Sequence, residues 1–398
     1  MKIHPALLLC LAEALSMAGF SVYPALLPEL RAEWGLTNTA AGLIGGAFFG
    51  GYMIAVPLLV GLTDRVPARR VYLAGCLLLA CGSVGFGRIA GGVRGAVLFQ
   101  AITGAGLAGT YMPGLKELSD SVRGPRQSRA IAFYTSTFGI GTSLSLLFAG
   151  AVADRAGWRE AFALSAIGPI AAAALVAAGL PSSGPTHGMP AARRLFDFAP
   201  VYRNRAVMGF ILGYSAHCWE LFALRSWMVA YFAYVAATHA AWPRGWTGPA
   251  LAAAINLLGP PSSILGNEAA AGRRKQTIVV LMLASAAAGF ATGWGAALGV
   301  TLAIALVAIY FVAIMSDSAA LTAGMVEAAD PAARGGAMAL HSFGGFAAGF
   351  LAPLVFGVML DAGGGAQSAV AWRLAFGGVA LVGVTGALTV RRMAGRVR

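Results

Sequence analysis

The chain has 398 residues, of which 58% are hydrophobic and only 11% are charged. A soluble domain carries roughly a quarter charged residues, so this composition excludes an array of soluble domains. The apolar content instead fits α-helices that cross a bilayer, each about 20 residues long. The formal net charge of +13 does not indicate a nucleic-acid partner, because cytoplasmic loops of membrane proteins collect Lys and Arg.

Apolar runs, bounded by charged or Pro/Gly-rich breaks, predict twelve transmembrane helices. In chain order they cover residues 5–27, 40–61, 71–92, 95–116, 129–152, 160–180, 207–236, 247–267, 276–297, 300–326, 335–360 and 372–390. Glu13 interrupts the first run, so we interpret this run as a retained helix rather than a signal peptide. We therefore expect an all-α integral membrane protein.

The longest polar stretch, residues 181–206, separates two sets of six predicted helices. We predict an N-terminal six-helix bundle at 1–180, a cytoplasmic linker at 181–206 and a C-terminal six-helix bundle at 207–398. If both termini are cytoplasmic, about 20 Lys and Arg lie inside and about seven outside, which satisfies the positive-inside rule. The Ala-, Gly- and Arg-rich composition favours a multi-pass protein of a bacterial cytoplasmic (inner) membrane.

The two halves of the sequence resemble each other. At one offset, Ala130-Ile-Ala-Phe-Tyr134 aligns with Ala337-Met-Ala-Leu-His341, Gly150 with Gly357 and Asp154 with Asp361, and after a short insertion Trp158-Arg159 and Phe162 align with Trp372-Arg373 and Phe376. Chance similarity between Ala-rich helices is the alternative, but the matched polar residues favour an internal repeat of spans 5–6 as spans 11–12.

The loop between the second and third predicted spans contains a pattern of charged residues, with a counterpart in the second half. It reads Val60-Gly-Leu-Thr-Asp64-Arg65-Val-Pro67-Ala-Arg69-Arg70, and the second half has Leu265-Gly-Asn267-Glu268-Ala-Ala-Ala-Gly272-Arg273-Arg274. Together with the span count, the repeat and the linker, this loop resembles the signature loop of the major facilitator superfamily, although Val60 and Pro67 stand where the pattern usually has Gly. The resemblance implies two pseudo-symmetric six-helix bundles, a central cavity and transport by alternating access.

The same loops predict a conformational latch, formed by Asp64, Arg65, Arg69, Arg70, Asn267 and Arg273. A carboxylate such as Asp64 can lie against the positive N-terminal end of a neighbouring helix, while the arginines hold the interface side. Ordinary positive-inside charge explains Arg69 and Arg70 equally well.

Span 4 departs from the family. Gln100-Ala-Ile-Thr103-Gly104-Ala-Gly106 resembles a motif that usually begins with Arg and is associated with proton coupling, and Gln cannot supply that charge. Gly104, Gly106 and Gly109 favour close helix packing. Tyr111-Met-Pro-Gly-Leu115 is similar to nitrate/nitrite-type and related anion porters, but residues 40–59 and 247–267 lack the arginines that would hold such an anion.

Polar and charged residues inside the apolar spans are the candidates for substrate or coupling sites, because charges there by default face a cavity or a partner. The set comprises Glu13, Tyr23, Gln100, Tyr134, Tyr214, His217, Glu220, Arg225, Asp317 and His341. On a helical wheel those of span 7 share one arc, with Glu220 near the midplane and Arg225 near the outer interface, where it can snorkel. A structural hydrogen bond or pair between helices is the alternative for four of them: Glu13, Glu220, Asp317 and His341.

We expect a secondary active transporter that moves a small solute, with organic and inorganic anions as one candidate class, by proton-coupled alternating access. A multidrug or metabolite efflux antiporter is the alternative, although only Gly139-Ile-Gly141 remains of the drug-antiporter glycine motif, and a transporter-like sensor ranks below it. His217 and Glu220 lack a third metal ligand, and no P-loop is present. We therefore expect no enzyme activity, cofactor or metal; the expected partners are the solute, protons and membrane lipid, around a monomer.

Overall fold

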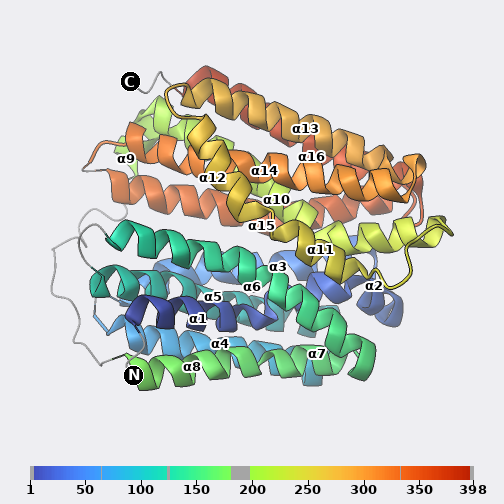
Figure 1. Cartoon of the computed structure of the whole chain (residues 1–398), viewed down its shortest axis with the longest axis horizontal. Helices are drawn as coiled ribbons and strands as arrows, with labels where there is room; N and C mark the ends of the chain where they lie inside the picture. The colour runs from blue at the N-terminus through green and yellow to red at the C-terminus, as the bar shows by residue number, and fades with distance from the viewer. Residues whose placement is uncertain (1–3, 64, 123–125, 181–197, 332, 395–398) are drawn as a thin grey trace. The chain divides into compact units, whose positions relative to one another are not determined.

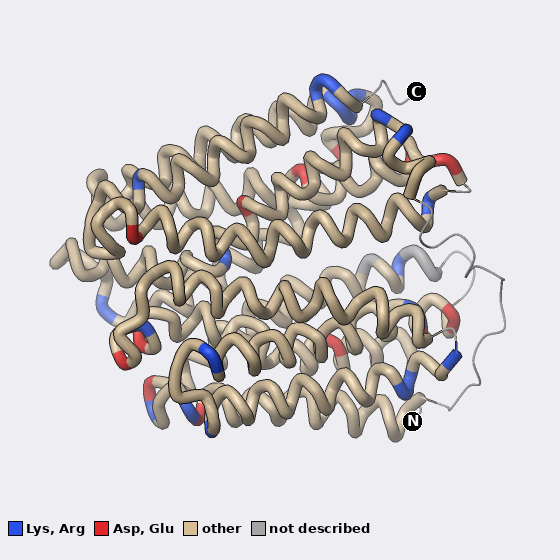
Figure 2. The backbone as a smooth tube through the Cα atoms, turned by 180° about the vertical axis from the view of Figure 1, so that it is seen from behind, with Lys and Arg blue, Asp and Glu red and all other residues tan. Residues whose placement is uncertain are grey.

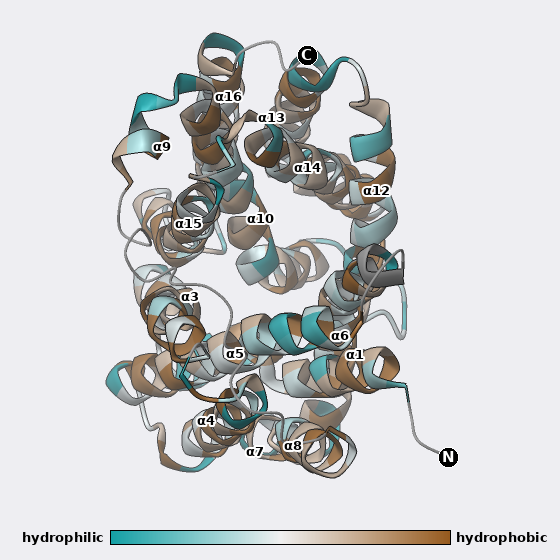
Figure 3. Cartoon of the chain, turned by 90° about the vertical axis from the view of Figure 1, so that its left-hand side faces the viewer, coloured by the Kyte–Doolittle hydropathy of each residue, from teal (hydrophilic) through white to brown (hydrophobic). Residues whose placement is uncertain are grey.

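The computed structural model describes residues 4–63, 65–122, 126–180, 198–331 and 333–394, and the regular elements in those ranges are helices (Figure 1). Within them, 10 helical segments are long and apolar enough to cross a membrane. Lys and Arg are concentrated toward helix ends (Figure 2), whereas apolar residues run along the helices (Figure 3). Large side chains such as Leu58 and Ile89 remain exposed, as a lipid-facing surface requires.

The chain divides into two compact units. Unit 1 comprises residues 1–36, 47–188 and 247–257, and unit 2 comprises residues 37–46, 189–246 and 258–398. The predicted bundle boundaries at residues 180 and 207 stay a prediction, and residues 181–197 of the predicted linker lie outside the described ranges.

Unit 1 contains α1 (Pro5–Ser16), the 3-10 helix η1 (Met17–Gly19), α2 (Val22–Trp34), most of α3 (Asn38–Leu62), α4 (Ala68–Ile89), α5 (Val93–Ser121), α6 (Arg126–Ala156), α7 (Trp158–Ser165), α8 (Ile167–Gly179) and α11 (Gly248–Asn256). Unit 2 contains the first turns of α3. It also contains α9 (Ala199–Arg203), α10 (Arg205–Thr238), α12 (Gly259–Ala269), α13 (Arg274–Leu298), α14 (Val300–Ala328), α15 (Arg334–Ala362) and α16 (Ala369–Met393).

Glycine sets the close helix packing in unit 1, as predicted for span 4. A Cβ on Gly75 of α4 would lie 2.6 Å from the carbonyl carbon of Gly109 in α5, and one on Gly104 would lie 1.8 Å from the carbonyl oxygen of Phe48 in α3. Only residues without a side chain allow backbones to approach so closely. The glycines of span 4 therefore pack α5 against two neighbours at once.

The first predicted span is interrupted. The chain leaves α-helical geometry at Met17–Gly19 and resumes as α2, which continues past the predicted end at residue 27 to Trp34 and stops at Gly35, whose φ is 58°. Pro28 lies inside α2 and does not end it, since proline is tolerated in membrane helices whose backbone groups find other partners.

Two of the twelve predicted spans are not among the ten apolar segments. Residues 95–116 do form a helix, α5, but its glycines and hydroxyl residues make it less apolar. Residues 247–267 form two short helices, α11 and α12, rather than one. Pro260 and Pro261 cause the break, because proline lacks the N–H that an uninterrupted helix requires.

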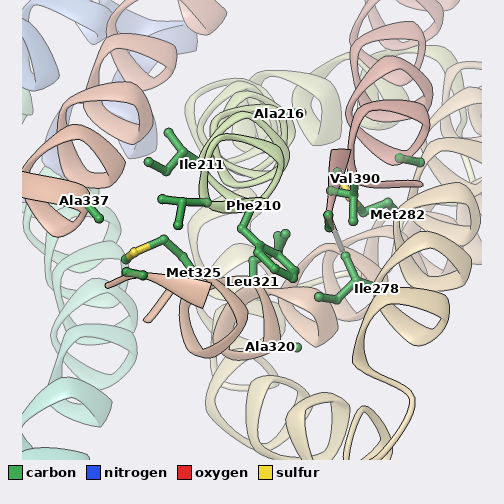
Figure 4. Packing of buried hydrophobic residues seen from close by; sticks show 14 of the residues in the cluster. Phe210, Ile211, Ala216, Ile278, Met282, Ala320, Leu321, Met325, Ala337 and Val390 are labelled. Atoms are coloured by element: carbon green, nitrogen blue, oxygen red, sulfur yellow. The ribbon is translucent and has the colours of Figure 1, made fainter. Parts of the chain in front are cut away.

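Helix α10 forms the centre of unit 2 and packs against α13, α14, α15 and α16. Figure 4 shows Phe210 and Ile211 of α10 among apolar side chains from those helices, including Met282, Leu321 and Val390. Because α10 is enclosed by neighbours, most of its circumference is buried. A helix in this position can bring polar side chains to several partners.

The first turn of α3 is held within unit 2 by Asp361 at the end of α15. Its carboxylate accepts hydrogen bonds from the backbone nitrogens of Asn38 (3.0 Å) and Thr39 (2.8 Å) and from their side chains, both at 2.7 Å. The approach requires Gly357, where a Cβ would lie 2.2 Å from the carbonyl oxygen of Asn38. A carboxylate at a helix N-terminus both satisfies free N–H groups and opposes the helix dipole.

Candidate functional site

Glu13 is fully buried in unit 1, with an exposed fraction of 0%. The hydroxyl oxygen of Tyr134 in α6 lies 3.1 Å from Oε2 of Glu13 and 2.9 Å from the backbone carbonyl oxygen of Tyr111 in α5. Gly114 permits this position, since a Cβ there would lie 2.3 Å from the Tyr134 hydroxyl. Oε1 of Glu13 has no hydrogen-bond partner among the described residues.

Glu220 is equally buried in unit 2, at 0% exposure. Its Oε2 lies 3.0 Å from the hydroxyl oxygen of Ser285 in α13, and its Oε1 lies 3.2 Å from that of Tyr310 in α14. On the remaining side stands Gly383 of α16, where a Cβ would be 2.7 Å from Oε2. Three helices therefore enclose one carboxyl carried by α10.

The two buried carboxyls are related by the internal repeat. Glu13 precedes Glu220 by the same number of residues by which Tyr134 precedes His341. This shared spacing is visible in the sequence itself. It indicates that one ancestral position in the first helix of each half carries both carboxyls.

Each carboxyl contacts a hydroxyl that has a second acceptor. Ser285 lies 2.9 Å from the carbonyl oxygen of Met282 as well as close to Glu220, and Tyr134 is shared in the same way between Tyr111 and Glu13. A hydroxyl has one proton to donate. A neutral carboxyl that donates to the hydroxyl oxygen completes both contacts, whereas a charged carboxylate leaves one acceptor without a proton.

A third polar group in unit 2 joins α10, α14 and α15. Nδ1 of His217 lies 2.6 Å from Oδ1 of Asp317, and both side chains are 1% exposed. The ring of Tyr214 stacks on His341 with centroids 3.7 Å apart and lies 5.5 Å from His217. Tyr134 of the first half corresponds to His341, so the same repeat position serves different contacts in the two units.

The polar and aromatic side chains of α10 contact several neighbouring helices of unit 2. Trp227 donates to the carbonyl oxygen of Pro353 in α15, while Tyr231 donates to that of Thr292 in α13. Arg225 lies 5.6 Å from the ring centroid of Phe311 in α14. The wheel predicted which side chains share an arc, but several helices enclose α10 and divide that arc among them.

Tyr23 and Gln100 are buried away from these contacts. The ring of Tyr23 packs edge-on against that of Phe86, with the centroids 6.2 Å apart. Gln100 lies buried in α5.

The structure describes all of the predicted latch residues except Asp64. Asp64 lies outside the described residues. Arg69 donates to the carbonyl oxygens of Val176 (3.4 Å) and Ala177 (2.6 Å), near the C-terminal end of α8, where a cation is favourable. Arg65 and Arg70 are exposed.

In the second-half loop, Arg274, which was not among the predicted latch residues, contacts the predicted latch residue Asn267. Arg274 donates to Oδ1 of Asn267 at 3.0 Å and to both carboxylate oxygens of Glu327 at 3.2 and 2.7 Å. Arg273 is exposed. Arg274 opens α13 and points back to α12, whereas Arg273 precedes the helix, so the helix start decides which arginine reaches the loop.

Among the described residues, no three or more His, Cys, Asp or Glu side chains could hold a metal ion together. The sequence profile of the Major Facilitator Superfamily matches residues 9–323. The chain belongs to this superfamily. Members are transporters rather than enzymes, so the chain is a secondary transporter that works by alternating access.

One curated relative of this superfamily member is the probable sphingolipid transporter spinster homolog 1 of Arabidopsis thaliana, which is 27% identical over 144 residues. That match covers 35% of this chain and spans only 28% of the length of the relative.

Solved structures resemble this transporter over nearly its whole length. A bacterial homologue of the human lysosomal transporter Spinster, in an inward-facing and occupied conformation, has a TM-score of 0.81 and 17% identity, covering 99% of this chain and 96% of that one. The inward-open xylose transporter XylE from E. coli has a TM-score of 0.77 and 15% sequence identity, and the match covers 98% of this chain and 96% of that one. The nucleoside transporter NupG has a TM-score of 0.77 and 13% sequence identity, and the match covers 98% of this chain and 100% of that one. At these identities the likeness establishes the shared fold.

Proposed function

We propose that this transporter couples the movement of a small solute to protons, and that Glu13 and Glu220 are the groups that bind and release them. The observation that carries the proposal is the pair of fully buried carboxyls, each beside a hydroxyl with a second acceptor. A protonated carboxyl completes these contacts, and a proton carrier must be stable in that state.

The hydrogen-bond surroundings also provide for release of the proton. A deprotonated Glu220 would accept from both Ser285 and Tyr310, and hydrogen bonds to a charged acceptor are among the stronger ones. Both protonation states can therefore be accommodated with the same side chains, at the cost of one backbone contact in the charged state.

Proton-coupled transport is tested in proteoliposomes that contain a pH-sensitive dye. Addition of a transported solute should move protons across the membrane, and an imposed proton gradient should drive accumulation. Glu13→Gln and Glu220→Gln should abolish both effects, whereas Glu160→Gln, whose carboxylate pairs with Arg88 at an exposed position, should leave them intact. Proton movement that persists in both buried variants would contradict the assignment.

The solute panel follows from the relatives and from the sequence. It includes a sphingolipid, a pentose sugar and a nucleoside, after the names of the similar proteins, and nitrate for the anion class that the sequence leaves open. Import and export are distinguished by the direction of the gradient that drives accumulation.

We further propose that the signature loop acts as a latch in a monomeric inner-membrane protein whose termini and linker are cytoplasmic. Lys116 of α5 supports the loop by donating to the carbonyl and hydroxyl oxygens of Thr63, at 3.0 and 3.1 Å. Asp64→Asn should slow solute exchange more than it weakens solute binding. Lost binding with a normal exchange rate would assign another role to the loop.

A further inference from the structure

The polar cluster of Tyr214, His217, Asp317 and His341 in unit 2 contains two buried atoms that the proton proposal does not use. They are Oδ2 of Asp317 and Nδ1 of His341, and neither has a hydrogen-bond partner among the described residues. Asp317 is 1% exposed and His341 is 6% exposed. Buried polar atoms in folded proteins are nearly always hydrogen-bonded, so two such atoms in one cluster require an explanation.

The contacts of His341 indicate that its Nδ1 is an acceptor. The hydroxyl oxygen of Thr322 lies 3.2 Å from the carbonyl oxygen of Ser318 and 3.3 Å from Nε2 of His341. Both contacts are hydrogen bonds only when Thr322 donates to the carbonyl and Nε2 carries the hydrogen that it donates to Thr322. In that tautomer a neutral His341 has a lone pair at Nδ1.

Asp317 supplies the second acceptor. His217 donates from Nδ1 to Oδ1 of Asp317 at 2.6 Å, which fixes the carboxylate and leaves Oδ2 for another donor. Tyr214 holds the two parts together, because its ring stacks on His341 and lies close to His217. Tyr214 is itself partly exposed, so the cluster reaches the surface of the chain at this residue.

A carboxylate oxygen and an imidazole lone pair can both accept hydrogen bonds, and neither can donate one. An anion would bring further acceptors and would be repelled by the carboxylate. A neutral hydroxyl could satisfy one atom with its single proton. An ammonium group has several N–H donors, which suit acceptors of this kind, and its positive charge would neutralise Asp317.

We propose that Asp317 and His341 bind the ammonium group of a cationic amine, which would make amines a solute class of this transporter. The inference rests on the proposed transport function but uses different residues from the proton-binding carboxyls. It replaces the anion class with a cationic one as the expected ligand of the C-terminal half.

The test uses three probes of similar size that differ in charge: phenethylamine hydrochloride, 2-phenylethanol and sodium phenylacetate. Binding to the full-length purified transporter is measured by calorimetry and by the shift in melting temperature. Phenethylammonium should bind at least about tenfold more tightly than 2-phenylethanol, the ratio that one charge-assisted hydrogen bond supplies. Equal binding of the amine and the alcohol, or tighter binding of phenylacetate, would overturn the proposal.

Variants locate the binding to the cluster. Asp317→Asn should weaken phenethylammonium by about tenfold or more. His341→Phe keeps a ring to stack on Tyr214 and removes the acceptor. It should therefore weaken binding of the amine with little effect on binding of the alcohol. This variant tests the proposal if Asp317→Asn fails to fold. His239→Gln is the matched control, because His239 contacts the carbonyl oxygen of Ala296 outside the cluster. Unchanged amine affinity in His341→Phe would refute the site.

Glu220→Gln separates this inference from the proposed proton coupling. It should bind phenethylammonium like the unmodified protein while losing proton-driven transport. Absent amine binding together with lost coupling in Glu220→Gln overturns the amine site alone. Intact amine selectivity with unimpaired proton coupling in Glu13→Gln and Glu220→Gln supports the site and overturns the proton assignment.

Discussion

Replacing Glu220 with Gln removes one titratable proton and retains the size and planarity of the side chain. The new amide can donate from its nitrogen to the Ser285 hydroxyl oxygen and accept at its oxygen from Tyr310, in place of contacts of 3.0 and 3.2 Å. It thereby reproduces the arrangement of a neutral carboxyl. Glu220→Gln is therefore a mimic of the protonated state.

The stability of this variant reports the charge of the native carboxyl. If Glu220 is neutral in the folded protein, the replacement exchanges like for like, and the free energy of unfolding should change by less than about 1 kcal/mol. If it is charged, the replacement removes two charge-assisted hydrogen bonds at roughly 1.5–3 kcal/mol each. Unfolding in a denaturant series in detergent distinguishes these outcomes.

Transport by the variant should separate into two parts. Exchange of solute at equal concentrations should continue, because a permanently neutral side chain does not oppose the conformational change. Accumulation driven by a proton gradient should fall to the level of protein-free liposomes, and the pH dependence of exchange should flatten. Full accumulation with an unchanged pH profile would refute the reasoning, as would a loss of stability of about 3 kcal/mol or more.

Gly383→Ala should destabilise the transporter by about 1–3 kcal/mol and impair coupling, because the added Cβ would lie 2.7 Å from the Glu220 carboxyl. The control is Gly377→Ala, which should be tolerated, because the added Cβ would meet only Phe290 at 3.9 Å. Asp361→Asn should lower the free energy of unfolding by about 1–3 kcal/mol, because the first turn of α3 loses a charged acceptor of four hydrogen bonds. A cysteine introduced by Ser183→Cys, in a background without the exposed Cys81, should be labelled from the cytoplasmic side. Labelling from outside would overturn the proposed topology.

The sequence predicts most of the helices because the bilayer imposes a length and an apolar composition on each of them. The predictions fail where the backbone departs from regular geometry inside an apolar run. Composition does not reveal the 3-10 turn at Met17–Gly19, whereas the break between α11 and α12 could have been predicted from Pro260 and Pro261.

The buried carboxyls could be predicted because a charge in an apolar span is rare, but their partners could not. Ser285 and Tyr310 are ordinary hydroxyl residues in apolar helices, and their positions against Glu220 depend on the register of three helices. Close contacts such as the one at Gly383 fix that register, and the chain has 54 glycines. The sequence predicted close packing for the glycines of span 4, but it did not single out Gly383 among the others.

The internal repeat explains how one architecture can serve two different polar sites. In unit 1 the repeat position in α6 holds Tyr134, whose hydroxyl contacts the carboxyl of Glu13. In unit 2 the same position in α15 holds His341, which turns to Tyr214 and Thr322 instead. Glu220 obtains its hydroxyl partners from α13 and α14. The exchange of tyrosine for histidine therefore separates the buried carboxyl from the α15 side chain, and it leaves the second half with a cluster of acceptors for which the first half, as described, has no counterpart.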